Sequence, residues 1–129
     1  MTDRPTDAEL AILRVLWELG PSTVRDVHTA LELRQERELA YTTVLKLLQV
    51  MHDKGLVLRD ESARSHVYTP TSSEGAVQDR LLGDLVDKAF GGSAGALVLR
   101  ALSERPAGAD ELAEIRALLD QLERDRRLG

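Results

Sequence analysis

The sequence predicts a mostly α-helical protein with one small β-hairpin, and three observations support this class. Three segments with helical spacing of apolar residues precede Gly55. After Gly55 the period of the pattern changes from 3.6 to 2 over two short β-prone runs. Wide helical stripes of apolar residues then return after Pro70. We therefore expect one domain over residues 1–71 and a helical segment over residues 72–129.

Composition limits the class of protein further. The chain has 129 residues, a formal net charge of −5 and no cysteine, which excludes disulfides and cysteine metal sites. No apolar run approaches the roughly 20 residues that span a bilayer, and the N-terminus lacks a signal-peptide core. We therefore expect a soluble, cytoplasmic protein without membrane insertion. Acidic residues outnumber basic ones on both sides of residue 70, which disfavours indiscriminate nucleic-acid binding.

The first helix is defined by its cap and its stop. Thr6 followed by Glu9 has the form of a capping box. Gly20-Pro21 stops the helix after Leu19. Trp17 is interpreted as a core anchor, because tryptophan is usually buried. The predicted apolar residues of this helix are Leu10, Ile12, Leu13, Leu16 and Trp17.

The second helix is expected to begin after Thr23, a plausible N-cap with Asp26 in the first turn. It ends near Leu33 and is followed by a charged connector over residues 34–39. Its predicted core residues are Val24, Val27, Ala30 and Leu31. Together with the next segment, this order of helices predicts a helix-turn-helix arrangement with a longer than minimal turn.

The third helix, over residues 40–54, is the segment around which the chain is organised. One narrow stripe is apolar and consists of Val44, Leu47, Leu48 and Met51. The opposite side carries Thr42, Lys46, Gln49 and Asp53. Hydroxyl and amine donors near a helix N-terminus suit phosphate oxygens and base edges. This helix is therefore interpreted as the recognition helix of a DNA-binding domain.

A β-hairpin is predicted directly after this helix. Leu56–Arg59 and His66–Thr69 are short β-prone runs around a polar turn. Three helices followed by a hairpin are the order of a winged helix, in which the hairpin is the wing. Arg59, Arg64 and Ser65 lie on or beside its tip, where they can reach phosphates or the minor groove.

The C-terminal segment is predicted to contain three helices, over about residues 73–90, 94–102 and 109–126. The apolar faces of these helices must be buried against another surface, and a second copy of the same segment is the simplest candidate. The sequence therefore predicts a homodimer; the alternative is that these helices fold back on the first domain. The predicted dimer contacts, which include a coiled-coil-like seam in the last helix, are Leu81, Leu85, Leu112, Ile115, Leu119 and Leu122.

Several runs of the sequence resemble the penicillinase repressor family, the BlaI/MecI-like repressors. These runs are PTDAELAILRVLW, GPSTVRDVHTAL, AYTTVLKLLQVMHDKGLVLRDESARSHVYTP and the later LVLRAL and ELAEIRALLDQL. The resemblance covers nearly the whole chain and is most specific at Tyr41-Thr42-Thr43-Val44 and Lys54-Gly55-Leu56. The chain departs from the family pattern at Val50, where many relatives have arginine, and at Leu45.

The resemblance implies a homodimeric transcriptional repressor that binds a palindromic, double-stranded DNA operator through its third helix and wing. It also implies a regulatory partner, because a membrane-bound sensor protease can cut within the C-terminal segment of family members. The matching bond here joins Arg100 and Ala101, where the best-known members have Asn-Phe. The predicted DNA-binding residues are Tyr41, Thr42, Thr43, Leu45, Lys46, Gln49, Arg59, Arg64 and Ser65.

Plainer interpretations of these residues stay open. Thr42 and Thr43 can satisfy their own backbone in the first helical turn, and Lys46 can be an ordinary solvated lysine. Leu45 suits contact with a thymine methyl group or packing against the wing. The winged helix as a whole can instead be a protein–protein interaction module without sequence-specific DNA binding, which the acidic balance would suit.

The sequence predicts neither a metal site nor an enzyme. The three histidines, His28, His52 and His66, are widely spaced, and no pair has the i, i+4 spacing of a helical chelate. The chain has no nucleophile elbow, no phosphate-cradling glycine loop and no zinc-protease motif. We therefore expect no cofactor.

Overall fold

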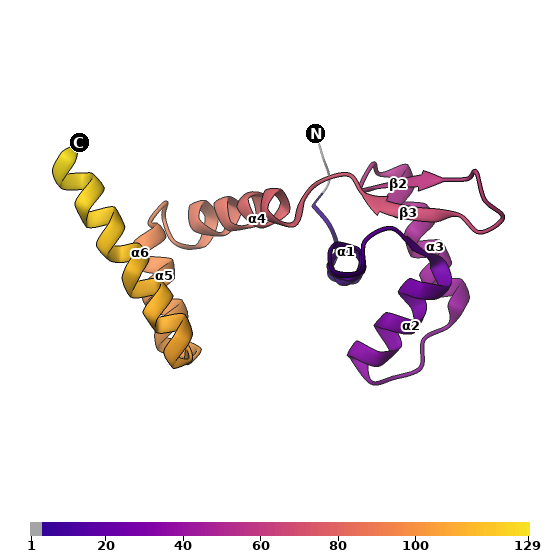
Figure 1. Ribbon diagram of the computed structural model, residues 1–129, viewed down its shortest axis with the longest axis horizontal. Coiled ribbons are helices and arrows are strands. Elements are labelled where there is room, and N and C mark those ends of the chain that lie inside the picture. Colours follow the sequence, from indigo (N-terminus) through magenta and orange to yellow (C-terminus); the bar gives the residue numbers. More distant parts are fainter. Residues whose placement is uncertain (1–3) are drawn as a thin grey trace. The chain divides into compact units, whose positions relative to one another are not determined.

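The computed structural model describes residues 4–129, and the chain forms two compact units, shown in Figure 1. The first unit ends at Leu81, and the second runs from Leu82 to Gly129. The elements in chain order are α1 (Asp7–Leu19), β1 (Ser22–Thr23), α2 (Val24–Gln35), α3 (Tyr41–Asp53), β2 (Val57–Asp60), β3 (Val67–Pro70), α4 (Glu74–Ala89), α5 (Ala94–Glu104) and α6 (Ala109–Leu128).

The predicted N-terminal caps of α1 and α2 are confirmed. The Thr6 hydroxyl accepts a hydrogen bond from the Glu9 N–H at 3.2 Å, and the Glu9 carboxylate accepts one from the Thr6 N–H at 2.9 Å. Thr23 and Asp26 form the same reciprocal pair at 3.2 and 3.1 Å. Each box satisfies two backbone donors that a helix N-terminus otherwise leaves free. Both helices therefore begin where the sequence predicts.

The hairpin is confirmed, but it belongs to a three-stranded antiparallel sheet with the order β1-β3-β2. Each hairpin strand begins and ends one residue later than predicted. The third strand, β1, was not predicted, because two residues are too few to show a period. Ser22 pairs with Tyr68 and Thr23 with Val67. This pairing places the start of α2 beside the wing.

The core of the first unit lies between the three helices and the sheet. Tyr68 from β3 is 1% exposed, and Val15, which the sequence pattern did not assign to the core, is also buried. The other buried residues of this cluster are Ile12, Leu13, Leu16, Val24, Val27, Leu31, Val44, Leu48, Met51, Leu56 and Val57. The third helix therefore buries one stripe and leaves its opposite side to solvent, as predicted.

The first turns of α4 belong to the first unit. Val77 is buried, and the indole Nε1 of Trp17 donates a hydrogen bond to the Ser72 carbonyl at 3.0 Å. Trp17 is only half-buried, so it contributes to the core edge as well as to this contact. The contacts group residues up to Leu81 with the first unit, whereas the predicted domain boundary followed residue 71; that assignment stays a prediction.

The second unit consists of helices without a closed core. Gly91 and Gly92 have φ of 58° and 83° and end α4, since this left-handed region favours glycine. Ser93 then caps α5 by accepting a hydrogen bond from the Ala96 N–H at 3.0 Å. Neither α5 nor α6 buries a residue. None of the helices within residues 4–129 combines the length and the apolar character of a membrane-spanning segment.

Candidate nucleic-acid interface

The N-terminal half of α3 presents a polar face. Tyr41, Thr42, Thr43, Lys46 and Gln49 are exposed, while the stripe on the other side of the helix is buried. The helix therefore has the two-sided character that the sequence predicts. Contact of these five residues with DNA stays a prediction, as does that of the half-buried Leu45, which packs against the core.

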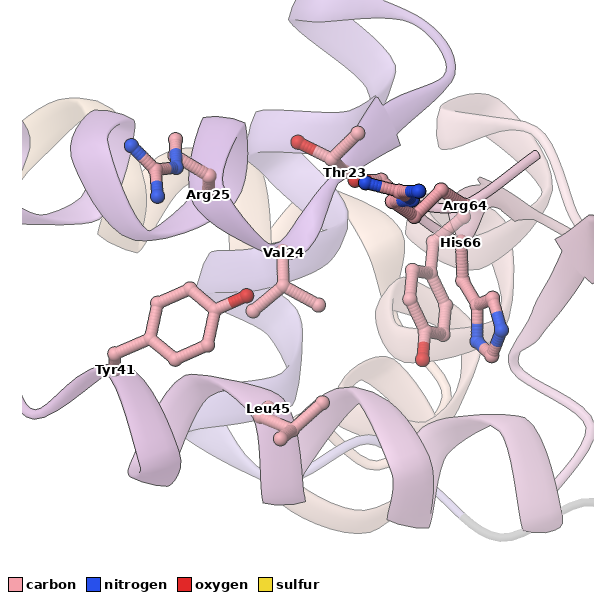
Figure 2. A pocket seen from close by; sticks show the side chains of 9 residues that line it. Thr23, Val24, Arg25, Tyr41, Leu45, Arg64 and His66 are labelled. Carbon is pink, nitrogen blue, oxygen red and sulfur yellow. The ribbon is translucent and has the colours of Figure 1, made fainter. Parts of the chain in front are cut away.

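A groove of about 330 Å³ lies beside this face, between the starts of α2 and α3 and the wing (Figure 2). In Figure 2, Arg25 and Tyr41 lie on one side, Arg64 and His66 on the other, and Leu45 between them. The lining residues are Thr23, Val24, Arg25, Tyr41, Leu45, Arg64, Ser65, His66 and Tyr68. Cationic and hydroxyl groups around an open groove suit a phosphate backbone.

Arg25, His66 and Thr23 were not among the residues predicted to bind DNA. The pairing of β1 with β3 brings them to the groove, and that pairing left no periodic signal in the sequence. One signal was available at Arg25, which lies in the first turn of α2. The helix dipole disfavours a cation there. An arginine at that position therefore points to a contact with an anion outside the helix.

The two arginines of the wing differ in how free their side chains are to contact DNA. Arg64 is exposed near the tip. The side chain of Arg59 is 23% exposed, and its guanidinium lies 3.7 Å from the Glu61 carboxylate, which is also 3.7 Å from His66 Nε2. Arg59 Nε is buried and has no hydrogen-bond partner among the described residues. Arg64 is therefore better placed than Arg59 to contact a phosphate.

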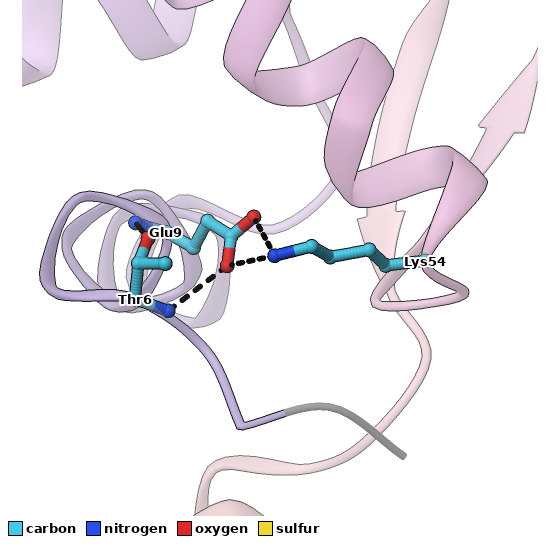
Figure 3. Close-up of polar contacts among 3 residues, drawn as sticks. All are labelled: Thr6, Glu9 and Lys54. Carbon is cyan, nitrogen blue, oxygen red and sulfur yellow. Dashed lines mark hydrogen bonds and ion pairs between the residues drawn. The ribbon is translucent and has the colours of Figure 1, made fainter. Parts of the chain in front are cut away.

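A buried ion pair fixes the C-terminal end of α3 (Figure 3). The Lys54 ammonium lies 3.1 and 3.0 Å from the two carboxylate oxygens of Glu9 in α1. Glu9 is 2% exposed and the Lys54 side chain 27%. Burial raises the pKa of Glu9, but the hydrogen bond from the Thr6 N–H and the Lys54 ammonium outweigh it, so the pKa lies below its ordinary value of 4.5. The Glu9 carboxylate is therefore ionised at neutral pH and pairs with Lys54 in that form.

A model of the penicillinase repressor family matches residues 5–121. The chain belongs to the penicillinase repressor family. It is 38% identical over 118 residues to the transcriptional regulator BlaI of Mycobacterium tuberculosis, covering 91% of this chain and 83% of that protein. It is 21% identical over 115 residues to the penicillinase repressor of Staphylococcus aureus, covering 89% and 90%. The resemblance seen in the sequence motifs is thus confirmed, and the family is one of transcriptional repressors, not enzymes.

A solved structure confirms the fold class. A mutant MarR from E. coli has a TM-score of 0.51 and 18% sequence identity with this chain, covering 91% of this chain and 76% of that one. At this identity the likeness concerns the fold alone. It supports a mostly helical winged-helix protein with a C-terminal helical segment.

The residues that the sequence assigned to dimerisation lie mostly on open surface in this penicillinase repressor family member. Leu85, Leu112, Leu119 and Leu122 are exposed, and Ile115 is half-buried. Leu81 is half-buried and lines a small groove of about 150 Å³ with Trp17 and Val77 in the first unit. The faces of α5 and α6 therefore remain available to a partner, and the dimer itself stays a prediction.

The predicted cleavage site lies inside a helix. Arg100 and Ala101 are in the middle of α5 and both are exposed. Arg100 lies 3.8 Å from Glu104, one helical turn further on. Proteases act on locally opened chain segments, so cleavage at this bond requires α5 to unwind locally.

Proposed function

We propose that this chain is a homodimeric repressor that binds a palindromic operator through α3 and the wing. The observation that carries the proposal is the exposed polar start of α3, with Thr42, Thr43 and Lys46, beside a groove lined by Arg25 and Arg64. Such donors can recognise base edges in the major groove, while contacts with phosphates position the domain on the DNA. Membership in a repressor family supports the same conclusion. Such a repressor works in the cytoplasm, where bacterial DNA lies.

The dimer is part of the proposal because one winged domain has few cations with which to bind DNA. The chain has a net charge of −5, so non-specific attraction to phosphates is small. The uncovered apolar faces of α5 and α6 offer the contact that joins two copies. A protease that cuts between Arg100 and Ala101 would separate α6 and its seam from the DNA-binding unit and so relieve repression.

The function is tested by selecting binding sites from a pool of random DNA duplexes with the purified intact chain. We expect enrichment of an inverted repeat whose half-sites are spaced by about 10 base pairs or a multiple, as symmetric dimers require. We call the enriched sequence the selected palindrome. No enrichment over the starting pool would contradict the proposed function.

Thr43→Ala tests base recognition by α3. We expect the change to cost about 1–3 kcal/mol in binding to the selected palindrome, because a good specific contact with a base is lost. Binding to a random duplex of equal length should change much less. Fluorescence anisotropy titrations measure both. An equal loss on the two DNAs would show that Thr43 only contacts the backbone.

Arg64→Ala tests the wing. A phosphate contact carries no sequence information, so we expect weaker binding to all DNA by a similar factor. The slope of log K against log salt should fall in magnitude by about one unit. Arg124→Ala in α6 removes the same charge outside the proposed interface and serves as the control. An unchanged salt slope for Arg64→Ala would exclude Arg64 from the interface.

A further inference from the structure

The start of α3 has no side-chain cap of its own. Its N-cap residue is Ala40, which has no hydrogen-bonding side chain. The Ala40 carbonyl accepts hydrogen bonds from the N–H groups of Thr43 and Val44 at 3.1 and 3.3 Å. A helix with an alanine N-cap is less stable at that end than one with Ser, Thr or Asp, because the first backbone N–H groups lack a side-chain acceptor. The first turn of α3 therefore depends on contacts other than a side-chain cap.

Two residues of α2 supply those contacts by binding both backbone groups of Leu39. His28 Nε2 lies 2.6 Å from the Leu39 carbonyl oxygen, and the Leu39 N–H donates to Glu32 Oε2 at 3.0 Å. A carbonyl oxygen can only accept, so Nε2 of His28 carries the hydrogen. The two side chains are one helical turn apart, with Nε2 3.6 Å from Glu32 Oε2. We call His28 and Glu32 the α2 clip.

The α2 clip also reaches the first residue of α3. The rings of His28 and Tyr41 meet edge to face, with centroids 5.8 Å apart and an interplanar angle of 69°. Leu39 is half-buried and packs against the core. Only Ala40 separates Leu39 from α3, so the contacts that α2 makes with Leu39 act next to the first turn of α3. At the other end, Lys54 ties the helix to Glu9 of α1.

We propose that His28 and Glu32 are positioning residues for base recognition, acting through the backbone of Leu39 on Thr42 and Thr43. The inference rests on the proposed function. Short side chains such as threonine contact base edges only when the helix lies at the right depth and angle. Arg25 and Arg64 have longer and more flexible side chains, which can reach phosphates over a wider range of helix positions. Loss of the clip should therefore reduce discrimination between sequences more than it reduces binding to DNA in general.

The first test compares His28→Gln with His28→Phe. Glutamine keeps an N–H donor at about the reach of Nε2, whereas phenylalanine keeps an aromatic ring beside Tyr41 and loses the donor. The quantity measured is the ratio of affinities for the selected palindrome and for a random duplex of equal length. We expect the ratio to fall about tenfold in His28→Phe and to stay within about twofold of wild type in His28→Gln.

The second test uses Glu32, because it addresses the other hydrogen bond with independent variants. Glu32→Ala removes the acceptor for the Leu39 N–H, and Glu32→Gln keeps an oxygen there. We expect a fall in the ratio of about tenfold for the alanine variant and recovery in the glutamine variant. Glu18→Ala is the matched control: it removes an α1 carboxylate that pairs with Arg34 of α2 and is not a partner of the Leu39 backbone, so it should leave the ratio unchanged.

Thermal unfolding of each variant fixes a temperature at which all are folded, so that loss of fold does not imitate loss of discrimination. An undiminished ratio in His28→Phe overturns the inference, and so does an equal fall in His28→Phe and His28→Gln. A fall in Glu18→Ala as large as in Glu32→Ala also overturns it. A wild-type chain that does not discriminate between the two DNAs would instead contradict the proposed function.

Discussion

A fragment that ends at Leu81 is expected to bind the selected palindrome roughly 10²–10⁴-fold more weakly than the intact chain. In the proposed dimer the second half-site contact is intramolecular, and the fragment lacks α5, α6 and the second half of α4. A cut at this residue keeps Val77 in the core and the Trp17–Ser72 hydrogen bond, so we expect the winged domain to remain folded. Anisotropy titrations measure the affinities, and sedimentation measures the oligomeric state.

A duplex with a single half-site serves as the control for this fragment. Fragment and intact chain should bind it with similar affinity, because only one domain then contacts DNA. Binding of the full palindrome by the fragment as tightly as by the intact chain would contradict dimerisation through the C-terminal helices. A fragment that sediments as a dimer would contradict it too, since the exposed faces of α5 and α6 would then not be the contact.

Lys54→Met is expected to lower the free energy of unfolding by about 3 kcal/mol, because it leaves the buried Glu9 carboxylate without its counter-ion. We place the loss at the lower end of the range for buried pairs, since the Lys54 side chain is 27% exposed. Urea unfolding measures the change. Arg127→Met is the control: it breaks an exposed pair with Glu123 and should cost less than about 1 kcal/mol.

Acid pH adds an independent measurement of the same pair. The pKa of Glu9 is lower in the folded chain than its ordinary value of 4.5, so the unfolded chain binds more protons near that pH. The stabilisation is therefore fully present above pH 4.5 and is lost as the pH falls through the folded pKa. In Lys54→Met this acid dependence should shrink, because burial raises the pKa of Glu9 without an opposing cation. An unaltered acid profile would mean that Lys54 does not stabilise the Glu9 carboxylate.

Local patterns in the sequence were enough to predict most of the fold. Each helix of the first unit has an apolar stripe, and two of them begin with side-chain caps at Thr6 and Thr23, which are contacts between residues three apart. The hairpin gave a period of 2 in two runs. These signals depend only on neighbours along the chain, and they survive in the structure with shifts of one or two residues at element ends.

Contacts between distant residues were not predictable in the same way. Glu9 and Lys54 are 45 positions apart, and the sequence showed Glu9 only as part of a cap. The two-residue strand β1 has no period, so the placement of Arg25 and His66 on opposite sides of one groove was missed. The polar face of α3 was predictable because burial of Val44, Leu48 and Met51 leaves the opposite side outward. Which bases this face would contact depends on DNA geometry that no periodicity encodes.

The most direct test of the central claim is a salt titration of the intact chain on the selected palindrome and on a random duplex of equal length. A sequence-specific repressor should bind both more weakly as salt rises, yet prefer the palindrome by about 10³-fold or more at each salt concentration. Equal affinity for the two DNAs throughout, or no binding to either, would contradict the claim. That result would instead favour a winged helix whose acidic surface serves contacts with other proteins.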